Sequence, residues 1–363
     1  MPAAISSRQP QALMKAAVYT GNGQISVQSI PVPEIGPGEL LVRVESCGIC
    51  HTDLKKIHND LLPPPRVYGH ETAGVVEQVG DRVTRFRPGD RVVAFHHIPC
   101  LDCFYCNRKL YAQCALYKKV GITAGYEPAG GGFAQYVRVM DWIVERGLEK
   151  IPPKVSFDAA SFVEPVNTCL KAIAQAGPEA GDSVLIQGQG PIGLIFTMLA
   201  RRIGCSVLVT DRIAGRRELA RRFGAAEAWD PARHAVAEEV RARTGGRGAD
   251  LVIVAASAKG LVSEAIQSSR PGSKILLFAQ TSHAESISIS GADICVGERQ
   301  LIGSYSASVD LQKESAELVF SGQLPVEEVI SHRVPLPDLS LGIERALHPA
   351  DGSMKIIVQP QRW

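Results

Sequence analysis

Two short motifs in the first fifth of the sequence supply side chains that bind metals. A thiol and an acid occur in Cys50-His51-Thr52-Asp53, and an imidazole and a second acid follow in Gly69-His70-Glu71. Cys50 and His70 have the chemistry of two of the three protein ligands of an open zinc site, which keeps its fourth position for water or substrate. The two acids fit the surroundings of such ligands, because neighbouring carboxylates orient the ligands and tune the charge of the metal. Taken alone, the pair also fits a buried cysteine and a loop histidine.

A cluster of four cysteines is the most specific signal in the chain. Three of them are separated by two residues each, and the fourth follows shortly after; they are Cys100, Cys103, Cys106 and Cys114. Four thiolates on one lobe can surround Zn²⁺ as a closed tetrahedron without an open position. The pattern therefore predicts a structural zinc site, and the alternative is four free cysteines in a reducing compartment.

A glycine-rich turn lies between an apolar run, residues 183–187, and a helical pattern, residues 194–203. Glycines at such a turn let the backbone approach a pyrophosphate, and the N-terminus of the following helix supplies partial positive charge. A strand before the turn and a helix after it are the context that the dinucleotide-binding fingerprint requires. The predicted cofactor-binding residues of the turn are Gly188, Gly190, Pro191, Ile192 and Gly193.

An acid at the end of the next predicted strand, Asp211, bears on the choice of cofactor. Its carboxylate would accept hydrogen bonds from the adenosine ribose hydroxyls and repel a 2′-phosphate. We therefore expect NAD rather than NADP. Arg212 and Arg216 lie close behind and could attract the 2′-phosphate, so NADP remains the alternative.

The pattern of elements predicts an α/β protein with two domains. Short β-branched runs separated by Gly and Pro signals predict a partly open β-barrel over residues 15–139. From residue 183 strands and helices alternate, which implies right-handed crossovers and a parallel Rossmann sheet. We expect a flexible tail at 1–14, a catalytic domain at 15–165 and 305–363, and the Rossmann NAD-binding domain at 166–304.

Length and composition fit this division. The chain has 363 residues, of which 45% are hydrophobic and 21% charged, and two domains bury such a chain comfortably. The net charge of +2, without a basic stripe, argues against nucleic-acid binding. No apolar run has the length of a signal peptide or a membrane span. We expect a cytoplasmic protein, in which nine cysteines serve purposes other than disulfides.

Taken together, the motifs resemble those of the zinc-containing medium-chain alcohol dehydrogenase superfamily over essentially the whole chain after residue 14. The resemblance implies a GroES-like catalytic domain split around a Rossmann domain, with the active site in the cleft between them. It also implies two zinc ions per subunit and a homodimer or homotetramer, often joined through Rossmann sheet edges.

The third ligand of the open zinc site separates branches of that superfamily. Simple alcohol dehydrogenases have a cysteine, whereas Val163-Glu164-Pro165 looks like the polyol (sorbitol-type) and threonine dehydrogenase branches, which have a glutamate. The competitor is Cys169, but its offset from Lys171 does not match the frame of the family. We predict that Glu164 is the ligand and that Cys169 is a small buried hydrophobe.

The resemblance assigns roles to several further residues. It places His51 on the cofactor pyrophosphate and makes Thr52 the acceptor of the substrate hydroxyl proton, beside Asp53 and Glu71. Many relatives have a relay histidine where this chain has Lys55, and a lysine with a pKa near ~10.4 is a poor relay at neutral pH. The proton then leaves by another route, such as water and Glu71, or Lys55 contacts the cofactor ribose.

The substrate is expected to be a small polar alcohol. In the frame of the family, His96 and His97 line the substrate pocket, and a polar pair there favours a polyol or an amino alcohol. The predicted reaction is reversible oxidation of a secondary alcohol to a ketone by NAD⁺. The alternatives are an L-threonine 3-dehydrogenase-like activity and, in another class, a cofactor-binding protein without alcohol chemistry.

Overall fold

The computed structural model describes residues 12–117, 119, 121–127, 130–279, 286–349 and 352–362. Its contacts divide the chain into two units. The barrel unit consists of Met1–Phe162, His332–Leu347 and Ile356–Trp363, and the Rossmann unit of Val163–Ser331 and His348–Lys355. Most of the tail expected at 1–14 lies outside the described residues, and the first strand already begins at Leu13.

A curled antiparallel sheet forms the core of the barrel unit, and a small sheet lies at its side. The large sheet has the order β16-β17-β3-β5-β6-β9, with β8 pairing with β3 and β7 with β8; the small one has the order β2-β1-β4. The strands are β1 (Leu13–Gly21), β2 (Gln24–Pro31), β3 (Leu40–Gly48), β4 (Arg66–Val67), β5 (Glu71–Val79), β6 (Arg91–Ala94), β7 (Ile122–Thr123), β8 (Tyr136–Val139), β9 (Leu148–Lys150), β16 (Ile330–Pro335) and β17 (Lys355–Gln359).

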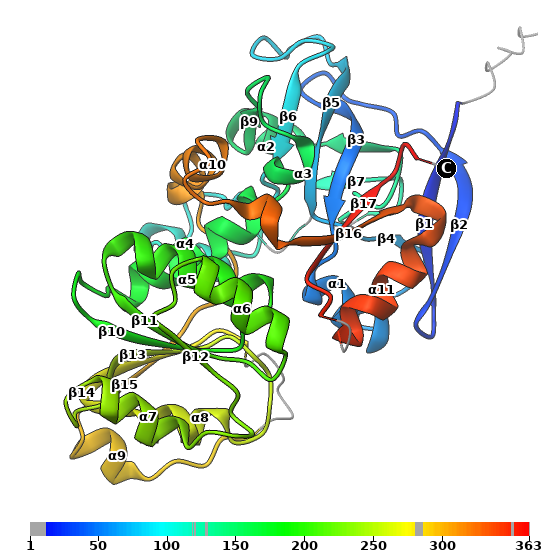
Figure 1. Cartoon of the computed structure of the whole chain (residues 1–363). Coiled ribbons are helices and arrows are strands. Elements are labelled where there is room, and N and C mark those ends of the chain that lie inside the picture. The colour runs from blue at the N-terminus through cyan, green and yellow to red at the C-terminus, as the bar shows by residue number, and fades with distance from the viewer. Residues whose placement is uncertain are drawn as a thin grey trace, which may run out of the picture. The chain divides into compact units, whose positions relative to one another are not determined.

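A strand from late in the sequence completes this sheet. Figure 1 shows β17 in red beside β3 in blue, and the two strands pair antiparallel with Ile357 opposite Gly48 and Val358 opposite Cys47. The backbone N–H of Ile49 also donates to the carbonyl of Ile356 at 2.9 Å. These contacts fix the backbone immediately before Cys50. The helices of the barrel unit are α1 (His51–His58), α2 (Asp141–Arg146), α3 (Phe157–Ala160) and α11 (Leu339–Leu347).

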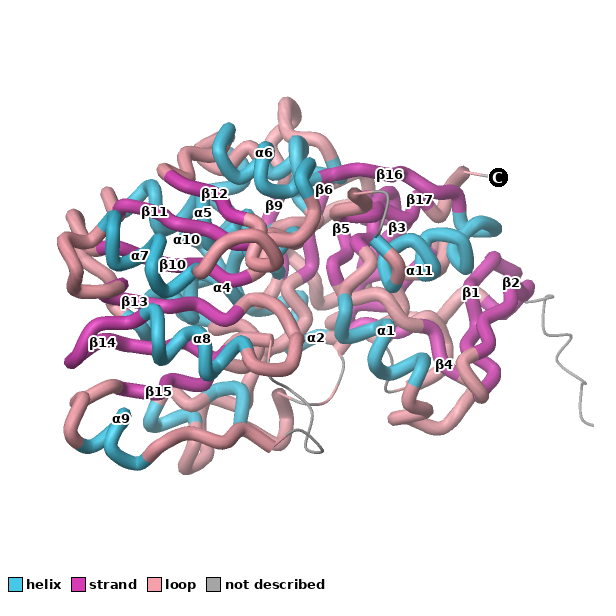
Figure 2. Tube along the Cα trace, turned by 60° about the horizontal axis from the view of Figure 1, so that its bottom comes forward, coloured by secondary structure: helices cyan, strands magenta, loops and turns pink. Residues whose placement is uncertain are grey.

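The Rossmann unit contains a six-stranded parallel sheet of order β12-β11-β10-β13-β14-β15 (Figure 2). In Figure 1 its helices lie on both faces, with α4, α5 and α6 on one and α7 and α8 on the other. The elements are α4 (Val163–Ala176), β10 (Ser183–Gln187), α5 (Pro191–Ile203), β11 (Ser206–Thr210), α6 (Ala214–Arg222), β12 (Glu227–Trp229), α7 (Val236–Arg243), β13 (Ala249–Val254), α8 (Leu261–Ser268), β14 (Ser269–Leu277), α9 (Gly291–Cys295), β15 (Gln300–Gly303) and α10 (Gln312–Phe320).

The sequence explains why the central strands and the first crossover helix form. The apolar residues of β10 are buried on both faces of the sheet, which requires a continuous apolar run rather than an alternating one. Pro191 is the first residue of α5, where its fixed φ suits a helix and its missing N–H costs nothing. Gly204 ends α5 with φ at 99°, a left-handed conformation that glycine adopts without strain.

The division of the chain by its contacts differs from the sequence-based expectation at residues 163–165, 305–331 and 348–355, which group with the Rossmann unit. Residues 305–331 belong to the Rossmann unit, because α10 and the segment before it pack against α4. The buried side chain of Asn167 joins these segments: its amide donates to the carbonyl of Ser308 and to Ser315 Oγ, and its oxygen accepts from the Ser308 N–H. Return to the barrel unit comes only at His332. Among the described residues, no helix combines the length and the apolar character that crossing a membrane requires.

Candidate functional site

The first metal-ligand candidate, Cys50, is fixed at the N-terminus of α1. Its Sγ accepts the backbone N–H of Thr52 at 3.5 Å, and its own backbone N–H donates to Asp53 Oδ2 at 3.3 Å. This reciprocal arrangement is a capping box in which a thiol takes the place of the usual hydroxyl. The N-terminal end of a helix also stabilises negative charge, which suits a metal ligand that binds as a thiolate. His51 and Thr52, in the first turn of α1, are exposed in this structure.

His70 is held by the same acid. Its Nδ1 lies 3.0 Å from Asp53 Oδ1, and Asp53 is only 1% exposed. Because Nδ1 is engaged, Nε2 is the ring nitrogen available to a metal, and a carboxylate behind a histidine ligand is the usual way to fix its orientation. Burial alone lowers the pKa of His70, but the Asp53 carboxylate and the Cys50 thiolate raise that pKa well above its ordinary value. The site therefore has a negative potential that favours a cation.

Glu71 brings a third donor to this cluster. Ligand atoms of Cys50, His70 and Glu71 all lie within 4.8 Å of one another, and Glu71 is buried in β5. A thiolate, an imidazole and a carboxylate at this separation form a donor set that Zn²⁺ accepts. Glu71, which was predicted to lie beside the ligands and to serve the proton route, thus has its carboxylate near enough to be a donor as well.

The four cysteines of the lobe converge as a closed metal site requires. Their Sγ atoms lie within 4.8 Å of one another, with separations of 3.5 Å for Cys103 and Cys106, 3.6 Å for Cys100 and Cys114, and 3.8 Å for Cys100 and Cys106. A tetrahedron with metal–sulfur bonds of ~2.3 Å has edges of about 3.8 Å. All four are free thiols. The lobe therefore fits Zn²⁺ bound by four thiolates.

Backbone amides support this assignment at Cys114. Burial raises the pKa of its thiol, but hydrogen bonds from the backbone N–H groups of Cys100 and Tyr117 outweigh burial and lower the pKa to about 6. The Cys100 N–H lies 3.4 Å from Cys114 Sγ. Amide donors aimed at a sulfur stabilise the thiolate, which is the form that binds metal.

His96 and His97 extend from the cluster at the end of β6. The ring of His96 meets the ring of His70 edge-on, with centroids 5.4 Å apart. The centroids of the His96 and His97 rings are 3.7 Å apart. His97 in turn stacks on Tyr117. His96 is 2% exposed, and its Nδ1 has no hydrogen-bond partner among the described residues. Burial lowers the pKa of His96 well below its ordinary value and that of His97 to about 3, so both rings are neutral at physiological pH.

The glycine-rich turn of the Rossmann unit has the geometry that its sequence predicts. A Cβ on Gly193 would lie 1.9 Å from the carbonyl oxygen of Gly188, and a Cβ on Gly188 would lie 2.6 Å from Ala256 Cβ. The space at Gly190 is open by comparison, since its nearest atom is Arg216 Nη1 at 3.8 Å. The first and third glycines thus allow close packing, and the second leaves the backbone accessible to a ligand at the start of α5.

Asp211 follows β11 and is oriented by two backbone amides. Its carboxylate accepts the N–H of Gln189 at 2.7 Å and that of Ile213 at 2.8 Å. Arg216 Nη1 lies 4.0 Å from the same carboxylate, and Arg216 Nη2 donates to the carbonyl of Ser353. Arg212 is exposed. The acid that was expected to meet the ribose is therefore tied to the glycine-rich turn itself.

Comparisons with known proteins agree with both halves of the fold. Residues 36–153 match the family model described as the alcohol dehydrogenase GroES-like domain, and residues 191–321 match that of the zinc-binding dehydrogenases. The L-threonine 3-dehydrogenase of Pyrococcus abyssi is 33% identical over 75% of this chain and 76% of its own length. The chain belongs to the zinc-containing medium-chain alcohol dehydrogenase superfamily.

Other relatives refine this placement within the superfamily. The (R,R)-butanediol dehydrogenase of Neisseria gonorrhoeae is 29% identical over 96% of this chain and 99% of its own length. The structure of a zinc-binding dehydrogenase of Sinorhizobium meliloti bound to NADP superposes with a TM-score of 0.84 at 30% identity, covering 96% of this chain and 100% of that one. The chain is thus a member of the polyol and threonine dehydrogenase-like branch, and its relatives dehydrogenate alcohols.

Within this medium-chain dehydrogenase, the remaining sequence-predicted residues lie in the Rossmann unit. Glu164 is buried in the first turn of α4. Cys169 is fully buried, its Sγ lies 3.9 Å from the carbonyl of Ile192, and burial followed by the nearby Glu164 carboxylate raises its pKa well above the ordinary value. Sequence reasoning missed Gln189, whose buried amide donates to the Gly188 carbonyl and accepts from Thr197 Oγ1. In the sequence, Gln189 stands between the first two glycines of the fingerprint, at a position for which the motif specifies no residue type.

Proposed function

We propose that this protein is an NAD-dependent dehydrogenase that reversibly oxidises a polyol-type secondary alcohol to a ketone. The observation that carries the proposal is the donor cluster of Cys50 and His70, oriented by the buried Asp53 and lying beside the buried, unpartnered Nδ1 of His96. A neutral imidazole with a free nitrogen offers a hydrogen bond that a second hydroxyl of the substrate would use. A simple apolar alcohol would leave that nitrogen unsatisfied, which costs binding free energy.

Each group has a defined task in this reaction. Zinc, held by Cys50 and His70, would supply Lewis-acid polarisation of the substrate oxygen, and NAD⁺ would accept the hydride at C4 of its nicotinamide. Thr52 would accept a hydrogen bond from the substrate hydroxyl and pass its proton on through water, so that the alcohol loses one proton to solvent and one hydride to NAD⁺ and becomes a ketone. The exposed position of Thr52, two residues after Cys50, gives its hydroxyl access to substrate. His51 is assigned to the cofactor pyrophosphate.

We further propose Glu164 as the third protein ligand. The packing of its rival supports this choice, because Cys169 is fully buried and its Sγ lies 3.9 Å from the carbonyl of Ile192. The test is zinc content in two variants. Glu164→Ala should lose the second zinc ion while Cys169→Ala keeps it, and the reverse pattern would transfer the role to the cysteine.

The preference for NAD rests on Asp211. Its carboxylate is held by the amides of Gln189 and Ile213, and Arg216 is bonded to the Ser353 carbonyl, so a 2′-phosphate would meet the acid first. A tenfold preference requires only ~1.4 kcal/mol. Values of kcat/KM with NAD and NADP should favour NAD in the wild type, and Asp211→Ala should improve NADP. A wild-type enzyme that prefers NADP would overturn the assignment.

The substrate class is tested by a screen of polyols, sugars, secondary alcohols and L-threonine with both cofactors. Threonine is the second candidate, because the Pyrococcus abyssi relative is an L-threonine 3-dehydrogenase. Zinc analysis separates both from a cofactor-binding protein without alcohol chemistry: about two zinc ions per subunit support the enzyme, whereas about one supports a structural site alone. Cys50→Ser is the matched inactive control.

The proposal also covers the oligomeric state of the protein and its location in the cell. The edge strand β15 and its flanks expose apolar side chains, with Val296 83% and Leu301 37% exposed, as a self-associating sheet edge would. We expect a homodimer or homotetramer, which light scattering would measure. A cytoplasmic setting, where thiols stay reduced, agrees with nine free cysteines.

A further inference from the structure

A polar cavity lies in the Rossmann unit, at the opposite end of the parallel strands from the glycine-rich turn. Its volume is about 410 Å³. The turn follows the carboxyl end of β10, whereas this cavity is lined by Arg247, Ser269 and Arg299, which stand at the amino ends of β13, β14 and β15. It therefore cannot be part of the predicted cofactor site, and the proposed reaction does not use it.

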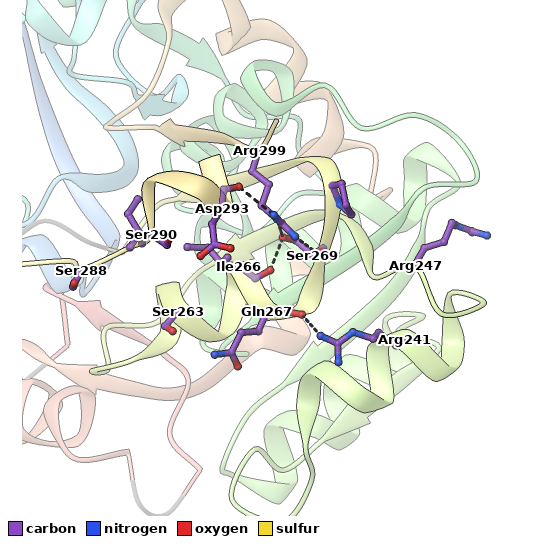
Figure 3. A pocket seen from close by; sticks show the side chains of 12 residues that line it. Arg241, Arg247, Ser263, Ile266, Gln267, Ser269, Ser288, Ser290, Asp293 and Arg299 are labelled. Carbon is purple, nitrogen blue, oxygen red and sulfur yellow. Dashed lines mark hydrogen bonds between the residues drawn. The ribbon is translucent and has the colours of Figure 1, made fainter. Parts of the chain in front are cut away.

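Guanidinium groups dominate the charge of this cavity. Three arginines and one acid, Asp293, contribute to its lining. Among the lining side chains, Figure 3 shows Arg299 above and Arg241 below, with Asp293 beside Arg299, Ser290 beyond Asp293, and Arg247 extending away from the others. Four serines and Gln267 complete the polar lining among the described residues. The excess of guanidinium groups over carboxylates makes the cavity attractive to an anion.

Hydrogen bonds hold two of these guanidinium groups in place without exhausting them. Arg299 donates through Nε to Ser269 Oγ, through Nη1 to the carbonyl of Asp293 and through Nη2 to the carbonyl of Ser269. Arg241 donates through Nη2 to the carbonyl of Gln267 at 2.9 Å. Arginine has five N–H donors, so both side chains keep donors that the protein does not use. A preorganised guanidinium loses little entropy when it binds phosphate.

We propose that this cavity is a binding site for a small phosphorylated molecule, with the phosphate between Arg241 and Arg299. Bidentate pairing of guanidinium with phosphate is among the strongest hydrogen-bonded interactions in proteins. Asp293 repels a bare phosphate but can accept a hydrogen bond from a hydroxyl or amine of the same ligand. The site is distinct from the predicted active site, and its existence does not depend on the dehydrogenase reaction.

The test is calorimetric titration of the zinc-loaded enzyme with inorganic phosphate at constant ionic strength. Saturating NADH is present throughout, because it excludes phosphate from the cofactor pyrophosphate site. We expect one phosphate per subunit in the wild type. Arg241→Ala should weaken binding at least ~10-fold, since it removes a charge-assisted interaction. Arg243→Ala is the matched control: this exposed arginine of the same helix pairs with Glu227 and does not line the cavity.

A variant with the opposite expected effect completes the design. Asp293→Asn removes the one carboxylate among the described residues that line the cavity and should tighten phosphate binding, whereas it would do nothing if phosphate bound elsewhere. Arg299→Lys keeps the charge but loses the planar fork, and should weaken binding if the enzyme folds as judged by its melting temperature. The proposal fails if phosphate does not bind, or if Arg241→Ala and Arg243→Ala bind it equally well. The phosphate titration does not depend on whether the enzyme oxidises any alcohol in the substrate screen, so the two proposals can fail separately.

Discussion

Replacing Asp53 by asparagine tests how the predicted catalytic metal site is held. Asp53 uses both carboxylate oxygens, one toward His70 Nδ1 at 3.0 Å and the other toward the Cys50 N–H at 3.3 Å. When Nε2 of His70 binds a metal, Nδ1 carries the proton. His70 Nδ1–H and the Cys50 N–H then both donate to the Asp53 carboxylate. Asparagine has one acceptor and one donor group, so it can satisfy only one of them.

The expected loss follows from these contacts. One hydrogen bond to a charged group contributes ~1.5–3 kcal/mol, which corresponds to about 10- to 150-fold in a dissociation constant. Loss of the carboxylate that accepts a hydrogen bond from a metal-binding histidine typically lowers metal affinity ~10–100-fold. We therefore expect Asp53→Asn to bind the second zinc ion at least ~10-fold more weakly.

The assay is zinc transfer to a chelator of known affinity. The zinc bound by four cysteines serves as an internal reference, because Asp53 does not contact that lobe in the described part of the chain. Asp81→Asn is the control variant, since Asp81 is an exposed acid of the same unit. An Asp53→Asn protein that releases zinc as slowly and holds it as tightly as the wild type would refute the role of this acid.

Three further predictions concern the cofactor turn, the lobe and the Rossmann sheet. Gly193→Ala places a methyl group 1.9 Å from the Gly188 carbonyl oxygen, so the turn must move, and calorimetry should show NADH affinity falling ~10-fold or more. Cys103→Ser should lower the melting temperature more than it lowers the rate of the chemical step, because a closed thiolate site contributes folding free energy; unchanged stability with abolished turnover would contradict this. At Asp250, burial raises the pKa, but hydrogen bonds from Arg270 and the Ser183 N–H outweigh burial and lower it. A lowered pKa adds stability that is present at neutral pH and is lost as pH falls through that pKa, below ~4. Asp250→Asn should therefore be less stable than wild type at pH 7, and urea titrations should show the difference vanishing in acid.

Local spacing was enough to predict the lobe and the glycine-rich turn. In Cys100, Cys103 and Cys106 the ligands are so close in sequence that chain geometry alone brings the sulfurs together. The turn around Gly190 depends on one strand and one helix that are adjacent in the chain. The geometry of such motifs is determined by residues that are close together in the chain, so they can be recognised in a single sequence.

Contacts between distant segments were harder to predict. The grouping of residues 305–331 with the Rossmann unit depends on Asn167, a buried amide whose partners lie more than a hundred residues away. Likewise, the proximity of the Glu71 carboxylate to Cys50 depends on the pairing of β3 with β5, where Gly48 lies opposite Glu71. No local pattern encodes these pairings, because hydrophobic periodicity specifies which face is buried but not which strand is the neighbour.

The pairing of β17 with β3 has a consequence for the order in which the protein is made. The Rossmann unit is almost continuous in sequence, whereas the sheet beside Cys50 is completed by residues 356–359. On the ribosome, the main segment of the Rossmann unit, Val163–Ser331, is synthesised before the strand that pairs with Cys47 and Gly48. Long-range pairing of this kind is slow to form, because the entropy cost of closing the loop comes before the stabilising contacts are made. We therefore expect a metal site at Cys50 and His70 to form after the lobe of four cysteines, whose ligands are close together in the sequence.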